Sequence, residues 1–120
     1  MTPDLARALE AALEIELETT GRRTGRAHRA TVWFAPVGDV LWLRTDRSSD
    51  WYRNLVADPR CLVRVGKLHI RALREPVDDE PTALRDLIER WRAKYGQEWV
   101  ADWYVERGRI PVRVRLLGPK

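Results

Sequence analysis

Six short runs of this sequence alternate apolar and polar residues with a period of two, and this pattern constrains the fold most strongly. The clearest run is 14–20, where Ile15 and Leu17 alternate with glutamates. Such a period is typical of β-strands with one buried and one solvent-exposed face. Short links between runs favour antiparallel hairpins, so six such strands indicate a barrel or a sandwich. The other runs are 29–36, 40–45, 60–65, 67–75 and 110–117.

Three other segments have the signals of helices. Thr2 can cap a first helix that has Pro3 at its first position. The second predicted helix is 50–57, which an Asp-Pro pair ends. The third runs from about 81 to 95 with apolar residues at helical spacing, and Gly96 ends it.

The composition defines the broad class of protein. With 120 residues the chain predicts one domain, 1–120, and its apolar fraction of 44% argues against disorder. The longest stretch without a charge, 30–38, is far shorter than the roughly 20 apolar residues of a membrane span. Acids from Asp4 onward do not resemble a signal peptide, so we expect a cytoplasmic protein. A single cysteine, Cys61, excludes an internal disulfide, and with two histidines it is too little for a structural zinc site.

The excess of positive charge lies in one segment. No acid occurs between Glu18 and Asp39, whereas four arginines do, and they account for the whole net charge of +4. Residues 19–26 read TTGRRTGR. The glycines permit positive φ, so backbone N–H groups, guanidiniums and hydroxyls can converge on a phosphate or carboxylate. A strand follows where a P-loop or a dinucleotide fingerprint requires a helix, and a plain basic hairpin loop is the alternative.

A second polar cluster occurs at 45–55, with the sequence TDRSSDWYRNL. A strand ends there and a helix begins, and donors at a helix start can bind an anion or the polar edge of a ring. Asn54 is unusual because it has weak helix propensity and lies inside a short helix. The alternative is capping by the residues at 48–50 with Trp51 and Leu55 in the core, which suits those two apolar residues better.

The sequence contains no recognisable catalytic group. Cys61 alternates with Val63 and Val65, which predicts a buried small hydrophobe and not a nucleophile. His28 and His69 have no serine or cysteine partner at the spacing of a hydrolytic triad. We expect His69 to face solvent, whereas His28 lies beside the arginines and is a candidate ligand contact.

Taken in this order, the segments LETTGRRTGRAHRATVWF and DWYRNLVADPRCLVRVG resemble the deazaflavin-dependent nitroreductase and quinone reductase family. The resemblance covers about 14–75 and includes the last strand. It implies a split β-barrel, mainly β with flanking helices, that binds the deazaflavin coenzyme F420 or, alternatively, FMN. The implied reaction transfers hydride from reduced F420 to an electron-poor acceptor such as a quinone, a nitro compound or an activated enone. The family also implies a homodimer, and substrate near the aromatic stretch at 97–108.

The resemblance implies where the cofactor is held. The loop at 22–25 would hold its anionic part, while Thr45 and the turn at 51–54 would surround the ring or its phosphate. Together with neighbouring polar residues of the two clusters, the predicted cofactor-binding residues are Arg22, Arg23, Thr24, Gly25, His28, Thr45, Ser49, Trp51, Arg53 and Asn54.

The alternative function is a binding module without turnover. A small barrel with an arginine-rich loop can bind single-stranded nucleic acid, with Trp33, Trp42 or Trp51 as stacking platforms. A non-catalytic flavin or tetrapyrrole carrier is a variant of this hypothesis. Nucleic acid is disfavoured because the chain outside one loop is neutral, so we expect a small-molecule partner.

Overall fold

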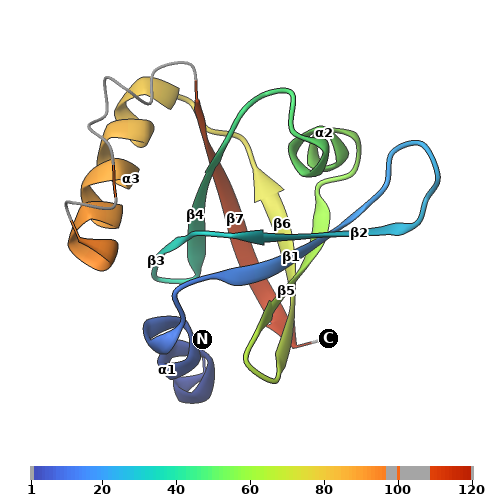
Figure 1. The fold of residues 1–120 in the computed structure, drawn as a ribbon. Coiled ribbons are helices and arrows are strands. Elements are labelled where there is room, and N and C mark those ends of the chain that lie inside the picture. Colours follow the sequence, from blue (N-terminus) through green and yellow to red (C-terminus); the bar gives the residue numbers. More distant parts are fainter. Residues whose placement is uncertain (1, 97–99, 101–108, 120) are drawn as a thin grey trace.

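The chain folds into one strongly curved antiparallel sheet with helices around it (Figure 1). The computed structural model describes residues 2–96, 100 and 109–119. These residues form a sheet of seven strands in the order β2-β1-β5-β6-β7-β4-β3. The strands are β1 (Ile15–Thr20), β2 (Ala27–Val32), β3 (Ala35–Val37), β4 (Val40–Thr45), β5 (Arg60–Val65), β6 (Leu68–Glu75) and β7 (Ile110–Pro119).

The sheet forms a half-barrel, since β2 and β3 are the two ends of the strand order and do not pair with each other among the described residues. This confirms the predicted split barrel of mostly antiparallel strands. The prediction of one strand at 29–36 was wrong, because the chain leaves β2 at one edge and enters β3 at the other. At this crossing the Phe34 N–H donates to Tyr95 Oη at 3.2 Å, and the Phe34 carbonyl accepts from Lys94 Nζ at 3.0 Å.

The described helices begin where the sequence predicts, to within one residue. Thr2 Oγ1 accepts from the Leu5 N–H at 3.2 Å, and an Asp79 oxygen accepts from the Thr82 N–H at the same distance. Gly96 ends the last helix with a φ of +97°. No helix in the described part of the chain combines the length and apolarity that a membrane crossing needs. The helices are α1 (Pro3–Ala11), α2 (Asp50–Ala57) and α3 (Glu80–Tyr95).

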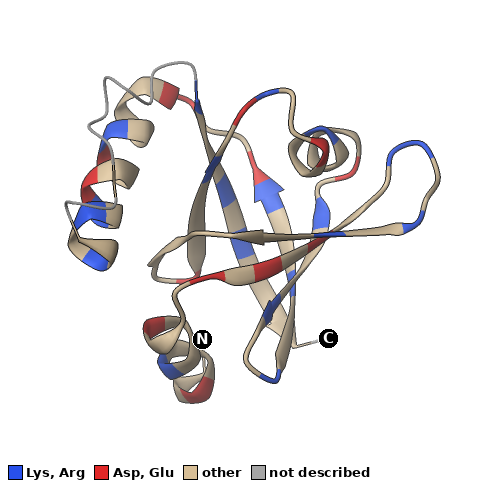
Figure 2. Cartoon of the chain, viewed as in Figure 1, with Lys and Arg blue, Asp and Glu red and all other residues tan. Residues whose placement is uncertain are grey.

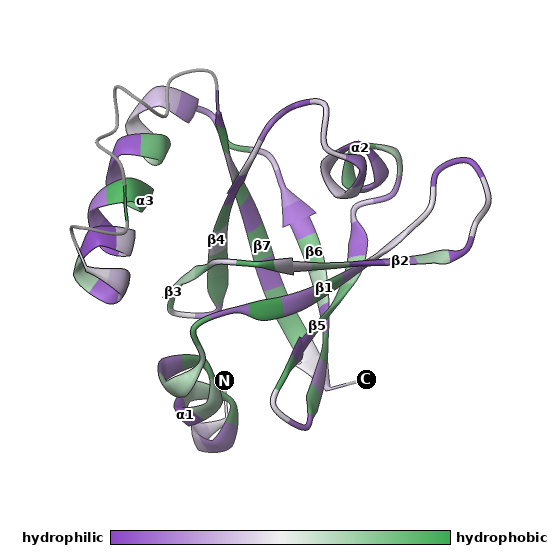
Figure 3. Cartoon of the chain, in the orientation of Figure 1, coloured by the Kyte–Doolittle hydropathy of each residue, from purple (hydrophilic) through white to green (hydrophobic). Residues whose placement is uncertain are grey.

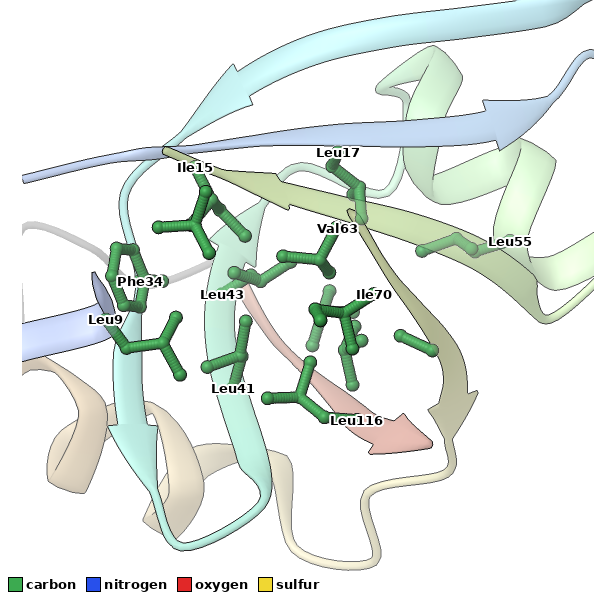
Figure 4. Packing of buried hydrophobic residues seen from close by; sticks show 14 of the residues in the cluster. Leu9, Ile15, Leu17, Phe34, Leu41, Leu43, Leu55, Val63, Ile70 and Leu116 are labelled. Atoms are coloured by element: carbon green, nitrogen blue, oxygen red, sulfur yellow. The ribbon is translucent and has the colours of Figure 1, made fainter. Parts of the chain in front are cut away.

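Two apolar clusters hold these elements together. The larger fills the barrel, where inward residues of the strands meet Leu9 of α1 and Leu55 of α2 (Figure 4). The smaller lies between α3 and the sheet, where Leu87 and Trp91 pack near Ala35 of β3. Figure 3 shows the hydrophilic character of the β1–β2 loop, in contrast to the apolar stripes of the strands. The β1–β2 hairpin thus joins two strands of the packed barrel through a polar loop.

The predicted aromatic approach at 97–108 lies outside the described residues, apart from Val100, which is buried in the cluster beneath α3.

Candidate anion-binding site

The β1–β2 loop, residues 21–26, is a tight turn closed by its own backbone; we call it the arginine loop. The Gly21 N–H donates to the Arg26 carbonyl at 2.7 Å, and the Gly25 N–H donates to the Gly21 carbonyl at 2.8 Å. Gly25 has a φ of +72°, in the left-handed region that favours glycine. A Cβ on Gly21 would lie 3.0 Å from both the Arg26 carbonyl oxygen and Thr24 Oγ1. The two glycines therefore determine the shape of the loop.

Two of the three arginines in this loop are open to a ligand. Arg23 and Arg26 are exposed, and their guanidiniums make no hydrogen bond or ion pair with any residue that the structure describes. Within the same residues, the backbone N–H groups of Arg23 and Thr24 have no acceptor. Figure 2 shows this basic tip extending beyond α2. Such donors suit a phosphate or a carboxylate.

Arg22 differs from its neighbours because α2 already binds its side chain. Its Nη1 donates to Asn54 Oδ1 at 2.9 Å, and its Nη2 donates to Asp50 Oδ1 at 3.2 Å. Nη1 also lies 3.4 Å from the Asp50 carbonyl oxygen. The Arg22 side chain is only 20% exposed. Its guanidinium therefore lies against α2 with its charge paired.

Asn54 connects this arginine to the sheet. Its Oδ1 also accepts from the Arg22 backbone N–H at 3.1 Å, and its Nδ2 donates to Thr19 Oγ1 at 3.1 Å. Asn54 and Thr19 are each 2% exposed. Thr19 belongs to β1, which pairs with β2 on one side and β5 on the other. An intramolecular network therefore explains why a residue of weak helix propensity lies inside this short helix.

The start of α2 has the capping and core pattern that the sequence offered as an alternative. Ser49 Oγ accepts from the Tyr52 N–H at 3.3 Å and so caps the helix. Trp51 and Leu55 both belong to the barrel core, and Trp51 is 8% exposed. Only a small part of Trp51 is thus open to a ligand.

Three further predicted residues have different surroundings. Thr45 is buried at the end of β4, and Arg53 is exposed on α2. His28 is half-buried in β2, opposite Thr19 in the β1–β2 pairing. The structure thus joins Arg22 directly to Asn54 and places His28 beside their shared network. Within the described residues, no hydrogen bond joins the side chains of Thr45, Ser49 or Arg53 to the arginine loop, and their contact with a ligand stays a prediction.

The segment between β4 and α2 is tied to other elements by ion pairs. Asp46 accepts a hydrogen bond at 2.8 Å from Nη1 of Arg109, the residue just before β7. Arg47 donates to Glu80 of α3, also at 2.8 Å. All four side chains are partly or largely exposed, so each pair stabilises the fold only slightly. The pairs nevertheless orient the chain that enters α2.

His69 lies as the sequence predicts, whereas Cys61, which the sequence predicts to be buried, is only partly so. Cys61 is half-buried against the barrel core, and burial, followed by the charge of Asp58, raises the pKa of its thiol to about 12. A thiol of this pKa is not a nucleophile at neutral pH. His69 is exposed on β6. The described residues therefore suggest binding and orientation of a reactive group, and not covalent catalysis.

The C-terminal end of α3 is a feature that the sequence did not reveal. Lys94 Nζ lies 3.2 Å from the centre of the Phe34 ring, and burial lowers the pKa of this amine to about 8. Tyr95 stacks on Trp33 with ring centres 4.1 Å apart. Since these partners are some 60 residues apart in the chain, only the fold brings them together.

Sequence reasoning also did not single out Thr19, and it treated Asp50 only as a candidate cap. A signal for Thr19 existed, because it continues the inward alternation of Ile15 and Leu17. The pairing of Asp50 with Arg22 had no such signal, since it depends on how α2 packs on β1.

The arginine loop is separate from a cavity of about 380 Å³ beneath the start of α3. That cavity is lined by residues of α3, of the segment before it and of β3, β4 and β7, and includes no residue of the loop or of α2. The arginine loop is therefore an exposed surface that does not belong to this cavity.

Solved structures share this fold. An F420 reductase is 22% identical with a TM-score of 0.75, and the match covers 93% of this chain and 92% of that chain. A putative 5-nitroimidazole antibiotic resistance protein of Bacteroides thetaiotaomicron is 13% identical with a TM-score of 0.79, covering 97% and 80%. The heme storage protein HutZ of Vibrio cholerae is 14% identical with a TM-score of 0.72, covering 98% and 89%. At these identities the likeness shows a common fold.

The half-barrel, with its basic hairpin loop, has the split-barrel fold that these solved structures share. Residues 3–116 match the F420H(2)-dependent quinone reductase family, and the chain belongs to that family. It is thus an F420-dependent reductase by class, as the sequence resemblance implied. A search of curated proteins finds no match.

Proposed function

We propose that this protein binds reduced F420 through the arginine loop and reduces a small electron-poor acceptor, either a quinone, a nitro compound or an activated enone. The observation that carries the proposal is the pair of unpaired guanidiniums, Arg23 and Arg26, on a loop that is otherwise closed by its own hydrogen bonds. The family match supports F420 as the cofactor and, among these acceptors, a quinone.

The donors of the loop fit the anionic tail of F420, which carries a phosphate and carboxylates. Guanidiniums form charge-assisted, often bidentate, hydrogen bonds with such groups. The free N–H groups of Arg23 and Thr24, with the turn at Gly25, add backbone donors beside them. Reduced F420 supplies a hydride when bound, so the chain needs no nucleophile or acid-base pair of its own.

We further propose that the ring lies toward the end of β4 and the start of α2. Thr45, Ser49 and Trp51 would line it, with His28 and Arg53 at its margin. The placement of the ring rests on the sequence resemblance. Thr45 and Trp51 are buried, so each could touch the ring only over a small area. The role of these residues is to orient the ring and to exclude water from one side of it.

Two further points belong to this proposal. We expect a homodimer, which sedimentation of the purified protein measures, and a cytoplasmic location, which cell fractionation measures.

FMN is the alternative cofactor, and a flavin or tetrapyrrole carrier is the alternative function. The fold likeness to a heme storage protein and to an FAD-binding protein of Mesorhizobium loti makes heme and flavins the appropriate competing ligands.

The test measures binding and turnover with the full chain. Fluorescence titration compares F420, FMN and hemin, and absorbance follows the oxidation of reduced F420 with menadione, a nitroimidazole and cyclohexenone as acceptors. The proposal expects F420 to bind most tightly and at least one acceptor to be reduced. Tight FMN or hemin binding without F420 binding would refute it, and F420 binding without turnover of any acceptor class would support a carrier.

A further inference from the structure

We propose that Asn54 is a positioning residue for the anion site: it holds the arginine loop against the barrel and keeps Arg22 folded onto α2. Arg23 and Arg26 are then left as the guanidiniums that meet the anion. The inference rests on the proposed function only for the identity of that anion. Its basis is the buried network of Asn54 with Arg22 and Thr19.

The hydrogen-bonding capacity of Asn54 shows why it acts through the loop and not by touching the ligand. An amide oxygen accepts two hydrogen bonds, and Asn54 Oδ1 already accepts both, from the N–H and from Nη1 of Arg22. The bond from Nδ2 to Thr19 Oγ1 fixes the amide with its oxygen toward the loop. A ligand donor could reach this oxygen only by displacing Arg22.

The burial of the network makes it persistent. Asn54 and Thr19 are each 2% exposed, so releasing the loop would leave an amide oxygen buried and unpaired. Thr19 is anchored in β1 between two neighbouring strands. The pair between Arg22 and the 68% exposed Asp50 side chain contributes little by comparison. The position of the loop therefore depends chiefly on Asn54.

The first arm of the test measures amide hydrogen exchange in the protein without cofactor. We expect the Arg22 N–H to be protected in the wild type and to exchange at least about tenfold faster in Asn54→Ala, with the core amides of β5 and β6 unchanged. Val56→Ala, at an exposed position of the same helix, is the matched control and should leave the Arg22 N–H protected. Unchanged exchange of the Arg22 N–H in Asn54→Ala would overturn the inference.

A conservative variant covers the case in which Asn54→Ala does not fold. Asn54→Asp keeps an acceptor for both Arg22 donors and can accept from the Thr19 hydroxyl, so the Arg22 N–H should stay protected. Loss of protection in a folded Asn54→Asp protein would also overturn the inference.

The second arm measures the affinity for F420 by fluorescence titration. We expect Asn54→Ala to bind F420 about tenfold more weakly and Val56→Ala to bind within about twofold of the wild type. A loosened loop with unchanged affinity would overturn the positioning role. If the wild type does not bind F420, the proposed function fails, and the exchange arm still decides whether Asn54 orders the loop.

Discussion

Removing the two open guanidiniums should weaken anion binding and leave the fold intact. The variant is Arg23→Ala with Arg26→Ala. Neither guanidinium makes a hydrogen bond or an ion pair with any residue that the structure describes, so the melting temperature should not change. In the complex, each charge-assisted hydrogen bond contributes about 1.5 to 3 kcal/mol, and an exposed loop favours the lower end of that range.

Two bonds at the lower end give about 3 kcal/mol, which corresponds to a Kd for F420 about 100-fold weaker. Isothermal titration calorimetry at two salt concentrations measures this Kd. The affinity of the wild type for F420 should fall more steeply with salt than that of the variant. The matched control is Arg71→Ala with Arg90→Ala, which removes the same charge from exposed positions on β6 and α3. A loss of less than about threefold, or an equal loss in the control, would refute the assignment.

Three further predictions concern the fold. Cys61→Ala should lower the unfolding free energy by about 1 kcal/mol, measured by urea denaturation, and leave turnover unchanged; rapid alkylation of the native thiol would contradict its raised pKa. Since burial lowers the pKa of Lys94 from 10.5 to about 8, the unfolded chain binds more protons between these values, and this residue adds stability as the pH rises through them. In Lys94→Met, the melting temperature should therefore rise less with increasing pH than it does in the wild type. Parallel plots of melting temperature against pH for the two proteins would exclude the effect. Ser49→Ala should cost about 1 kcal/mol in urea denaturation through loss of the α2 cap, and unchanged stability would show that the bond to Tyr52 contributes nothing.

Much of the fold could be predicted because its signals are local. Alternation in the strands and capping residues such as Thr2 depend on neighbours within a few positions, and the structure follows them. The exception is 29–36, whose alternation continues through a change of sheet edge. The crossing at Phe34 is held by Lys94 and Tyr95, which belong to a helix some 60 residues later. Alternation of apolar and polar residues within one segment does not indicate which distant residues the segment will contact.

In the candidate site, too, the local features could be predicted from the sequence and the contacts between distant residues could not. The glycines and arginines at 21–26 predict an anion loop from local chemistry alone, and the structure shows a turn that requires Gly21 and Gly25. Which arginines are open could not be predicted, because the partner of Arg22 is 32 residues away in α2. The number of arginines in the loop therefore overstates the charge that it presents.

This difference affects what the site can recognise. Arg22 is paired with Asp50 and bonded to Asn54, so the loop presents two open positive charges beside two free backbone N–H groups. The paired arginine still contributes, because its backbone N–H and its guanidinium connect the loop to α2 and, through Thr19, to β1. A loop tied in this way loses less conformational freedom when an anion binds than a free hairpin would. Asp50 and Asn54 of the second polar cluster thus bind the first cluster directly: α2 sets the position of the arginine loop, and the loop supplies the two open charges.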